Sequence, residues 1–180
     1  MKSHLRIFFC VAALSGLGLF RAAGAYEIFL SIPGIPGEST AFNHTNDIVV
    51  ESFSFGVSAG TAMVGGGGTT SPTFTTISIS KPLDKASPLL YVNCAAPKNL
   101  GTVVLTLRDS ANGTNEFYKV TMSDVTISSV KTSGEIGEDR PTEFVTLSFK
   151  KIQWKYTPID SNGKPGTPVV AAYDLSQISN

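Results

Sequence analysis

The sequence predicts a mainly β fold, a closed or nearly closed barrel of antiparallel strands, and the prediction rests on one long hairpin. The hairpin runs from Glu116 to Thr157, and its two arms are joined by the polar turn 132–141. Apolar and polar residues alternate along both arms, which is the period of strands with one buried face. The alternation also changes phase once in each arm.

The two phase changes are what predict a barrel. In the first arm the apolar residues begin at even positions (Tyr118, Val120 and Met122) and then move to odd ones (Val125 and Ile127). In the second arm the change falls at residues 150–151. If the hairpin folds about Ile136, the two changes lie at the same level, and both strands turn their later side chains to the other face. A sheet curls into a barrel through bulged, bent pairs of this kind.

Other segments predict further strands and one short helix. Alternating apolar residues predict strands at 27–32, 48–57, 74–79 and 102–108, and one further short segment follows at 169–175. The predicted buried face of the second strand is Val49, Phe53, Phe55 and Val57.

The predicted helix lies between Ser87 and Pro97. Ser87 is suited to cap its first turn, and Pro88 to take the first helical position. Leu90 and Cys94 then share one face. For Cys94 two interpretations are open, a buried inert thiol and a reactive or inter-chain cysteine.

The first 25 residues have the three parts of a secretory signal peptide. Lys2 and Arg6 form a basic head, residues 7–20 are mostly apolar, and Ala23-Gly24-Ala25 matches an A-x-A cleavage site. The apolar run is shorter than an ordinary membrane span. We therefore expect cleavage near Ala25, a secreted or periplasmic mature chain, and a single domain at 26–180.

The composition of the expected mature chain excludes two classes of partner. Cleavage removes Lys2, Arg6 and Arg21 and no acidic residue, so 14 basic against 14 acidic residues become 11 against 14. A mildly acidic chain has no electrostatic footprint for nucleic acid or anionic lipid. We expect no nucleic acid as a partner and no membrane span in the mature chain.

The sequence offers no catalytic residue, cofactor site or metal site. Gly56-Val-Ser58-Ala-Gly60 matches the nucleophile motif of hydrolases, but no helix is expected after Ser58, and His44 precedes it in the chain. Glu138 and Asp139 could form a carboxylate pair, although neighbouring acids beside Arg140 are far more often solvated or ion-paired. We expect that the protein is not an enzyme. A secreted serine hydrolase with Ser58 as its nucleophile is a remote alternative.

The chain resembles the Hcp proteins, which form the inner tube of bacterial type VI secretion systems. The resemblance covers nearly all of residues 26–180 in order. The residues that carry it are Gly34-Ile-Pro-Gly-Glu-Ser39, Ser52-Phe-Ser-Phe-Gly-Val-Ser58, Ile79-Ser-Lys-Pro-Leu-Asp-Lys-Ala-Ser-Pro-Leu-Leu90, Thr126-Ile-Ser-Ser-Val130 and Gly137-Glu-Asp-Arg-Pro-Thr-Glu-Phe-Val-Thr-Leu-Ser-Phe149.

The resemblance implies a two-sheet β-barrel with one short α-helix that assembles into six-membered rings, which stack as a tube. It also implies a structural role without an active site, with small effectors carried in the ring and a VgrG-type spike as a further partner. The subunit contacts that it suggests are Ala62, Met63, Val64, Gly65, Gly66, Gly67 and Gly68 of a glycine-rich loop and Glu138, Asp139 and Arg140 of the hairpin turn.

The signal peptide departs from the family, whose members assemble in the cytoplasm. Either this chain is exported and works outside the inner membrane, or the true chain begins after the apolar run. The alternative function is therefore an exported Hcp-like ring that binds a ligand or protein and is not part of a secretion tube.

Overall fold

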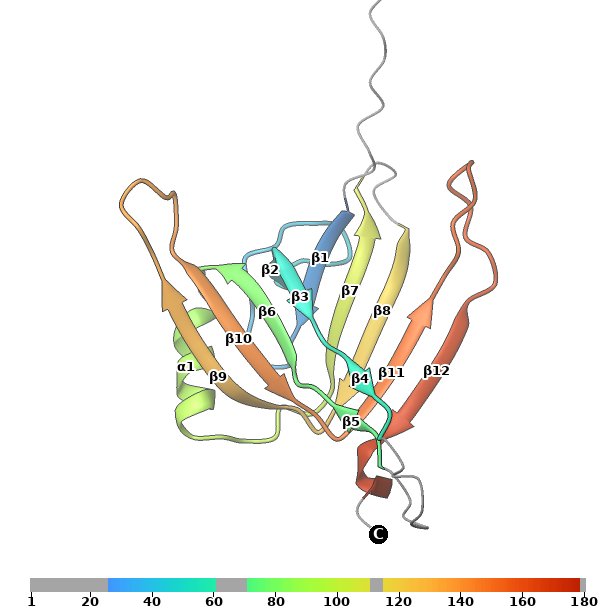
Figure 1. Ribbon diagram of the computed structural model, residues 1–180. Coiled ribbons are helices and arrows are strands. Elements are labelled where there is room, and N and C mark those ends of the chain that lie inside the picture. Colours follow the sequence, from blue (N-terminus) through green and yellow to red (C-terminus); the bar gives the residue numbers. More distant parts are fainter. Residues whose placement is uncertain (1–25, 61–70, 111–114, 179–180) are drawn as a thin grey trace, which may run out of the picture.

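The computed structural model describes residues 26–60, 71–110 and 115–178 of the chain (Figure 1). These residues form two main antiparallel sheets. The six-stranded sheet has the order β12 (Val169–Asp174), β11 (Lys151–Tyr156), β8 (Glu116–Ser123), β7 (Val103–Asp109), β1 (Tyr26–Ser31) and β2 (Ile48–Val50). The four-stranded sheet has the order β3 (Ser52–Ser54), β6 (Ile77–Pro82), β10 (Thr142–Ser148) and β9 (Thr126–Ser133).

Three smaller elements complete the described part. β4 (Val57–Ser58) and β5 (Thr73–Phe74) pair as a short ribbon, and the 3₁₀ helix η1 (Leu175–Ile178) follows β12. The helix α1 (Ser87–Ala95) lies beside β9, with Leu90 fully buried (Figure 1). Cys94 is a half-buried free thiol that packs against the core. No helix of the described residues is long and apolar enough to cross a membrane.

The long hairpin bends from one sheet into the other, as its phase changes predict. β8 belongs to the six-stranded sheet and its continuation β9 to the four-stranded sheet, and β10 and β11 make the same passage in reverse. The passages are level, because Ser123 pairs with Lys151 and Thr126 with Ser148. Between them Asp124 has a φ of 56°, a left-handed backbone that turns the strand.

A second bend joins the two sheets at Glu51, and here the predicted strand 48–57 was wrong. Ile48 and Val50 are buried, whereas Val49 is 42% exposed and Val57 57% exposed. Past the bend, Phe53 and Phe55 are the residues that pack against the core. The alternation of inward and outward side chains changes phase at Glu51, so the segment is divided into β2, β3 and β4. At the bend the Glu51 N–H donates to the Ser80 carbonyl over 2.8 Å.

The two bends close the order of pairing on itself. β3 pairs with β6, β6 with β10 and β10 with β9; β9 continues as β8, which pairs with β7, then β1, then β2, which continues as β3. The predicted two-sheet barrel is therefore confirmed. One apolar core lies inside it, built from both sheets and α1.

Candidate functional site

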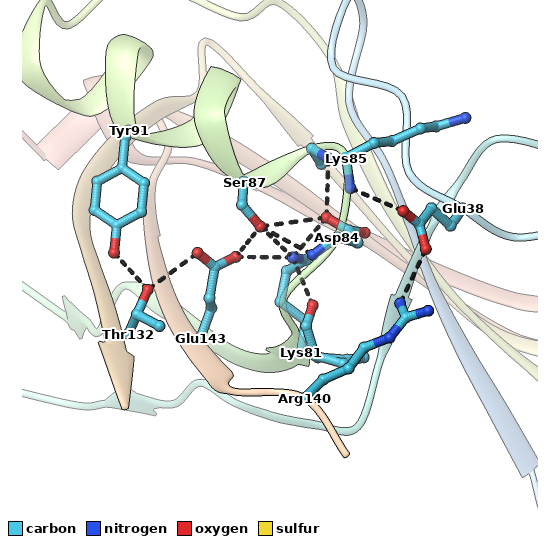
Figure 2. A network of polar contacts seen from close by, with 11 residues as sticks. Glu38, Lys81, Asp84, Lys85, Ser87, Tyr91, Thr132, Arg140 and Glu143 are labelled. Atoms are coloured by element: carbon cyan, nitrogen blue, oxygen red, sulfur yellow. Dashed lines mark hydrogen bonds and ion pairs between the residues drawn. The ribbon is translucent and has the colours of Figure 1, made fainter. Parts of the chain in front are cut away.

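Four polar side chains meet inside the barrel, where β6 leads into α1 (Figure 2). The Lys81 ammonium lies 2.7 Å from an oxygen of Asp84 and 2.8 Å from an oxygen of Glu143. The Ser87 hydroxyl donates to the same Glu143 oxygen over 2.5 Å. We call Lys81, Asp84, Ser87 and Glu143 the buried ionic cluster, since Lys81 and Glu143 are fully buried.

Strand register brings the cluster together. Lys81 and Glu143 are directly opposite each other on β6 and β10, and each continues the inward-facing phase of its strand, set by Ile79 and Val145. Asp84 follows in the turn before α1, where its carboxylate accepts the Ala86 N–H over 2.9 Å. The cluster thus connects two strands to the start of the helix.

The cluster holds two carboxylates against one ammonium, and hydroxyls supply further donors. Thr132 of β9 donates to the other Glu143 oxygen over 3.1 Å, and the Tyr91 hydroxyl of α1 lies 2.5 Å from the Thr132 hydroxyl. Buried charges persist only when they are paired and hydrogen-bonded. The geometry therefore indicates that the cluster has a structural role and ties the strands β6, β9 and β10 to the helix α1.

The expected cap of the helix was wrong. α1 begins at Ser87 with Ala86 as its N-cap residue, and no side chain caps the first turn. The Ser87 hydroxyl is used instead within the cluster, where it also accepts the Asp84 N–H over 3.1 Å. Pro88 consequently stands at the second helical position.

An exposed carboxylate, Glu38, continues the network outward (Figure 2). One oxygen accepts the Lys85 N–H over 3.1 Å, and the other lies 3.0 Å from the Arg140 guanidinium. The hydrogen bond from Arg140, followed by that from the Lys85 N–H, lowers the pKa of Glu38 below its ordinary 4.5. Glu38 thereby joins the loop before β2 to the base of the hairpin turn.

The predicted contact residues fall into two groups. Glu138, Asp139 and Arg140 lie in the turn between β9 and β10 and are exposed. The glycine-rich group Ala62, Met63, Val64, Gly65, Gly66, Gly67 and Gly68 lies outside the described residues. Whether either group contacts another subunit stays a prediction.

Sequence reasoning missed a face made of hydroxyl groups on the four-stranded sheet. Opposite the core, one row across the four strands is Ser54, Ser78, Thr146 and Ser129, and the next row is Ser52, Ser80, Phe144 and Lys131. We call these two rows the hydroxyl face. Ser52 and Ser80 hydroxyls are 2.7 Å apart. In these rows Lys131 carries the one charge and Phe144 the one aromatic ring, so the face is polar and nearly neutral.

The strand β12 forms an apolar edge of the six-stranded sheet. It pairs with β11 on one side, and its other side is the end of the sheet. Val169, Val170 and Tyr173 are 67%, 54% and 36% exposed. An exposed apolar edge strand is a template for pairing with another chain.

Ser58 and His44, the two residues considered for a hydrolase, lie in structural positions. Ser58 ends the ribbon strand β4 and pairs with Thr73. His44 is buried, with its ring stacked on Phe29 at 4.2 Å between centroids and its Nδ1 2.9 Å from Asp47. Its Nε2 lies 3.4 Å from a Glu116 oxygen. His44 therefore fastens the loop before β2 onto the sheet.

Fold and site together define a class: small two-sheet barrels with a buried ionic cluster and an exposed apolar edge strand. Within this class, residues 29–156 match the family described as "Type VI secretion system effector, Hcp". The chain belongs to the Hcp family, as its resemblance indicated.

Individual relatives agree with this family. Protein hcp1 of Pseudomonas aeruginosa is 39% identical over 104 residues, a match that spans 56% of this chain and 64% of that protein. The crystal structure of Hcp1 from Salmonella typhimurium is 33% identical, with a TM-score of 0.71, over 85% of this chain and 97% of that one. Another structure, of a type six secretion system protein, is 29% identical and has a TM-score of 0.78. The match covers 85% of this chain and 98% of that one.

Proposed function

We propose that the protein is a structural, non-enzymatic subunit that assembles into six-membered rings and stacks as the tube of a type VI secretion system. The observation that carries the proposal is the exposed apolar strand β12, together with membership of the Hcp family. A β-sheet edge of this composition is stabilised when another chain covers it.

The hydroxyl face supplies the second requirement of a tube, a wall along which cargo can pass. Four of its hydroxyls already pair with one another: those of Ser52 and Ser80 lie 2.7 Å apart, and those of Ser78 and Thr146 lie 3.4 Å apart. Few charges are present to hold a passing chain. We place this face toward the channel, with small effectors as cargo and a VgrG-type spike at the tip of the tube.

A specific sequence feature favours a second candidate function. Residues 1–25 have the pattern of a secretory signal, and cleavage near Ala25 would deliver the chain outside the inner membrane. There the same ring would act as a binding protein for a ligand or protein, apart from a secretion tube.

One pair of measurements separates the two candidates. Native mass spectrometry of the protein isolated from its own cells gives the particle mass, and N-terminal sequencing gives the start of the chain. A hexamer whose chain does not begin at the expected cleavage product Tyr26 supports the tube. A hexamer that begins at Tyr26 supports the exported ring, and a monomer contradicts both.

Two matched variants test the role of β12. Val170→Lys places a charge on the free edge and should convert hexamers to monomers, because charged residues block pairing at sheet edges. Val92→Lys is the control, since Val92 is an exposed valine on α1, with 63% exposure against 54% for Val170. Hexamers that survive Val170→Lys would contradict the assignment of this edge.

A further inference from the structure

The turn between β9 and β10 projects from one end of the molecule (Figure 1) and contains Ile136. Ile136 is fully exposed, more than any other large apolar side chain of the described residues. Two hydrogen bonds cross the turn: the Glu138 N–H donates to the Glu135 carbonyl over 3.4 Å, and the Glu135 N–H donates to the Glu138 carboxylate over 3.3 Å. At its base Arg140 is ion-paired with Glu38. A fully exposed isoleucine at the tip of a turn can serve as an anchor when a pocket on a partner encloses it.

The charges around Ile136 are mainly acidic. Glu135, Glu138 and Asp139 are all exposed in the same turn, and the Arg140 charge is offset by Glu38. We call Glu135 to Asp139 the acidic tip. A partner for this tip needs a hollow for one aliphatic side chain and a basic rim.

The opposite end of the molecule has a hollow whose lining includes one lysine and one aspartate, and a second lysine is next to the first in the chain. A cavity of about 500 Å³ opens between β8, β11, β12 and η1, and its lining includes Gln153, Ala172 and Tyr173. Lys151 also lines it, ion-paired with Asp174 at 2.9 Å. Lys150 is the next residue along the chain and is exposed, and among the described residues its ammonium has no ion-pair partner.

We propose that the acidic tip of one copy docks into this cavity of the next copy, with Ile136 inside the hollow and the acidic side chains beside Lys150. The proposal rests on the proposed self-assembly and names a contact for it. Because the two patches differ and lie at opposite ends of the subunit (Figure 1), the contact is heterologous and joins copies head to tail. Charge complementarity sets the orientation of docking.

Cysteine cross-linking tests the contact directly in the full chain. The starting variant carries Cys94→Ser, and Ile136→Cys and Gln153→Cys are added to it. Oxidation should give a ladder of dimers, trimers and larger species on a non-reducing gel, because each subunit then carries both halves of a head-to-tail link. Ile136→Cys combined with Lys98→Cys, an exposed position after α1, is the matched control and should give no ladder.

The outcomes separate this contact from the proposed function. A ladder confined to the Ile136 and Gln153 pair supports the contact. No ladder from a protein that is hexameric or longer by native mass spectrometry overturns the contact and leaves self-assembly intact. A protein that is monomeric in the Cys94→Ser background and in the unchanged chain overturns both.

A charge exchange gives a second, independent test. Asp139→Lys should raise the concentration at which rings join end to end by about tenfold or more, and Lys150→Glu should do the same. The two changes together should restore joining, because the opposite charges meet again. Equal or additive losses in the double variant would overturn the contact, and analytical ultracentrifugation measures all three.

Discussion

The buried ionic cluster and the Glu38–Arg140 pair fasten neighbouring parts of the molecule by ionic contacts of similar length. Lys81 and Glu143 are 2.8 Å apart with both side chains fully buried, whereas Glu38 and Arg140 are 3.0 Å apart with 43% and 57% of their side chains exposed. Exposed charges that separate regain favourable contacts with water, so an exposed ion pair stabilises the fold only slightly. A buried charge that loses its partner cannot be solvated by water, so its loss is costly. Burial, and not distance, should therefore decide how much each contact matters.

The largest expected effect is from Lys81→Met. Removing the ammonium leaves the carboxylates of Asp84 and Glu143 buried without a cation, which costs about 3–5 kcal/mol of the free energy of unfolding. Urea denaturation measures it. Lys85→Met is the matched control, because Lys85 is exposed and its ammonium contacts Asn46. Equal losses in the two variants would remove the distinction between buried and exposed pairs.

A smaller loss is expected from Ser87→Ala. The hydroxyl donates to Glu143 and accepts from the Asp84 N–H, so its removal leaves buried polar groups short of a partner, for about 1–3 kcal/mol. Ser133→Ala, at an exposed position of β9, should be close to neutral in the same denaturation experiment. A neutral Ser87→Ala would show that the cluster does not need its hydroxyl.

A still smaller, pH-dependent effect is expected from Glu38→Gln. The folded state lowers the pKa of Glu38 from 4.5, mainly through Arg140, so its contribution to stability is complete above pH 4.5 and is lost as the pH falls through the lowered value. Thermal unfolding at neutral pH should show a slight decrease, and the difference from wild type should vanish in acid. Glu51→Gln, another exposed carboxylate, is the control, and a difference that persists in acid would contradict the linkage.

The last prediction concerns the pKa of Asp174, which lines the cavity between β8, β11 and β12. Its pKa is lowered from 3.8 to about 2, first by the Ser176 hydroxyl and next by Lys151, so its contribution to stability is complete above pH 3.8 and declines as the pH falls toward 2. Measured by NMR titration, the Asp174 pKa should rise more in Ser176→Ala than in Lys151→Met. The reverse order would make the ion pair the main cause.

The sequence was sufficient for one bend of the barrel and insufficient for the other. The hairpin bend was visible because two long arms change phase at facing positions, which is a paired signal. The bend at Glu51 joins β2 and β3, each of three residues, and the phase change between Val50 and Phe53 has no second arm within the same hairpin to support it. Short strands carry too few alternations to fix their own inward face.

The buried ionic cluster could have been found, since alternation alone places Lys81 on the face of Ile79 and Glu143 on the face of Val145. Charged residues are usually exposed unless a partner is known, and the partnership depends on β6 pairing with β10 across 62 positions of the chain. That register is a property of the fold. The contact residues in the glycine-rich loop stay a prediction, because they lie outside the described residues.

Continuity of the long hairpin through both sheets has a mechanical consequence. Separating the six-stranded sheet from the four-stranded sheet requires two covalent backbones, β8 into β9 and β10 into β11, to be straightened under tension, in addition to the loss of side-chain packing. A third backbone crosses at Glu51. An assembly built from such subunits would carry mechanical load through its covalent backbones as well as through side-chain packing.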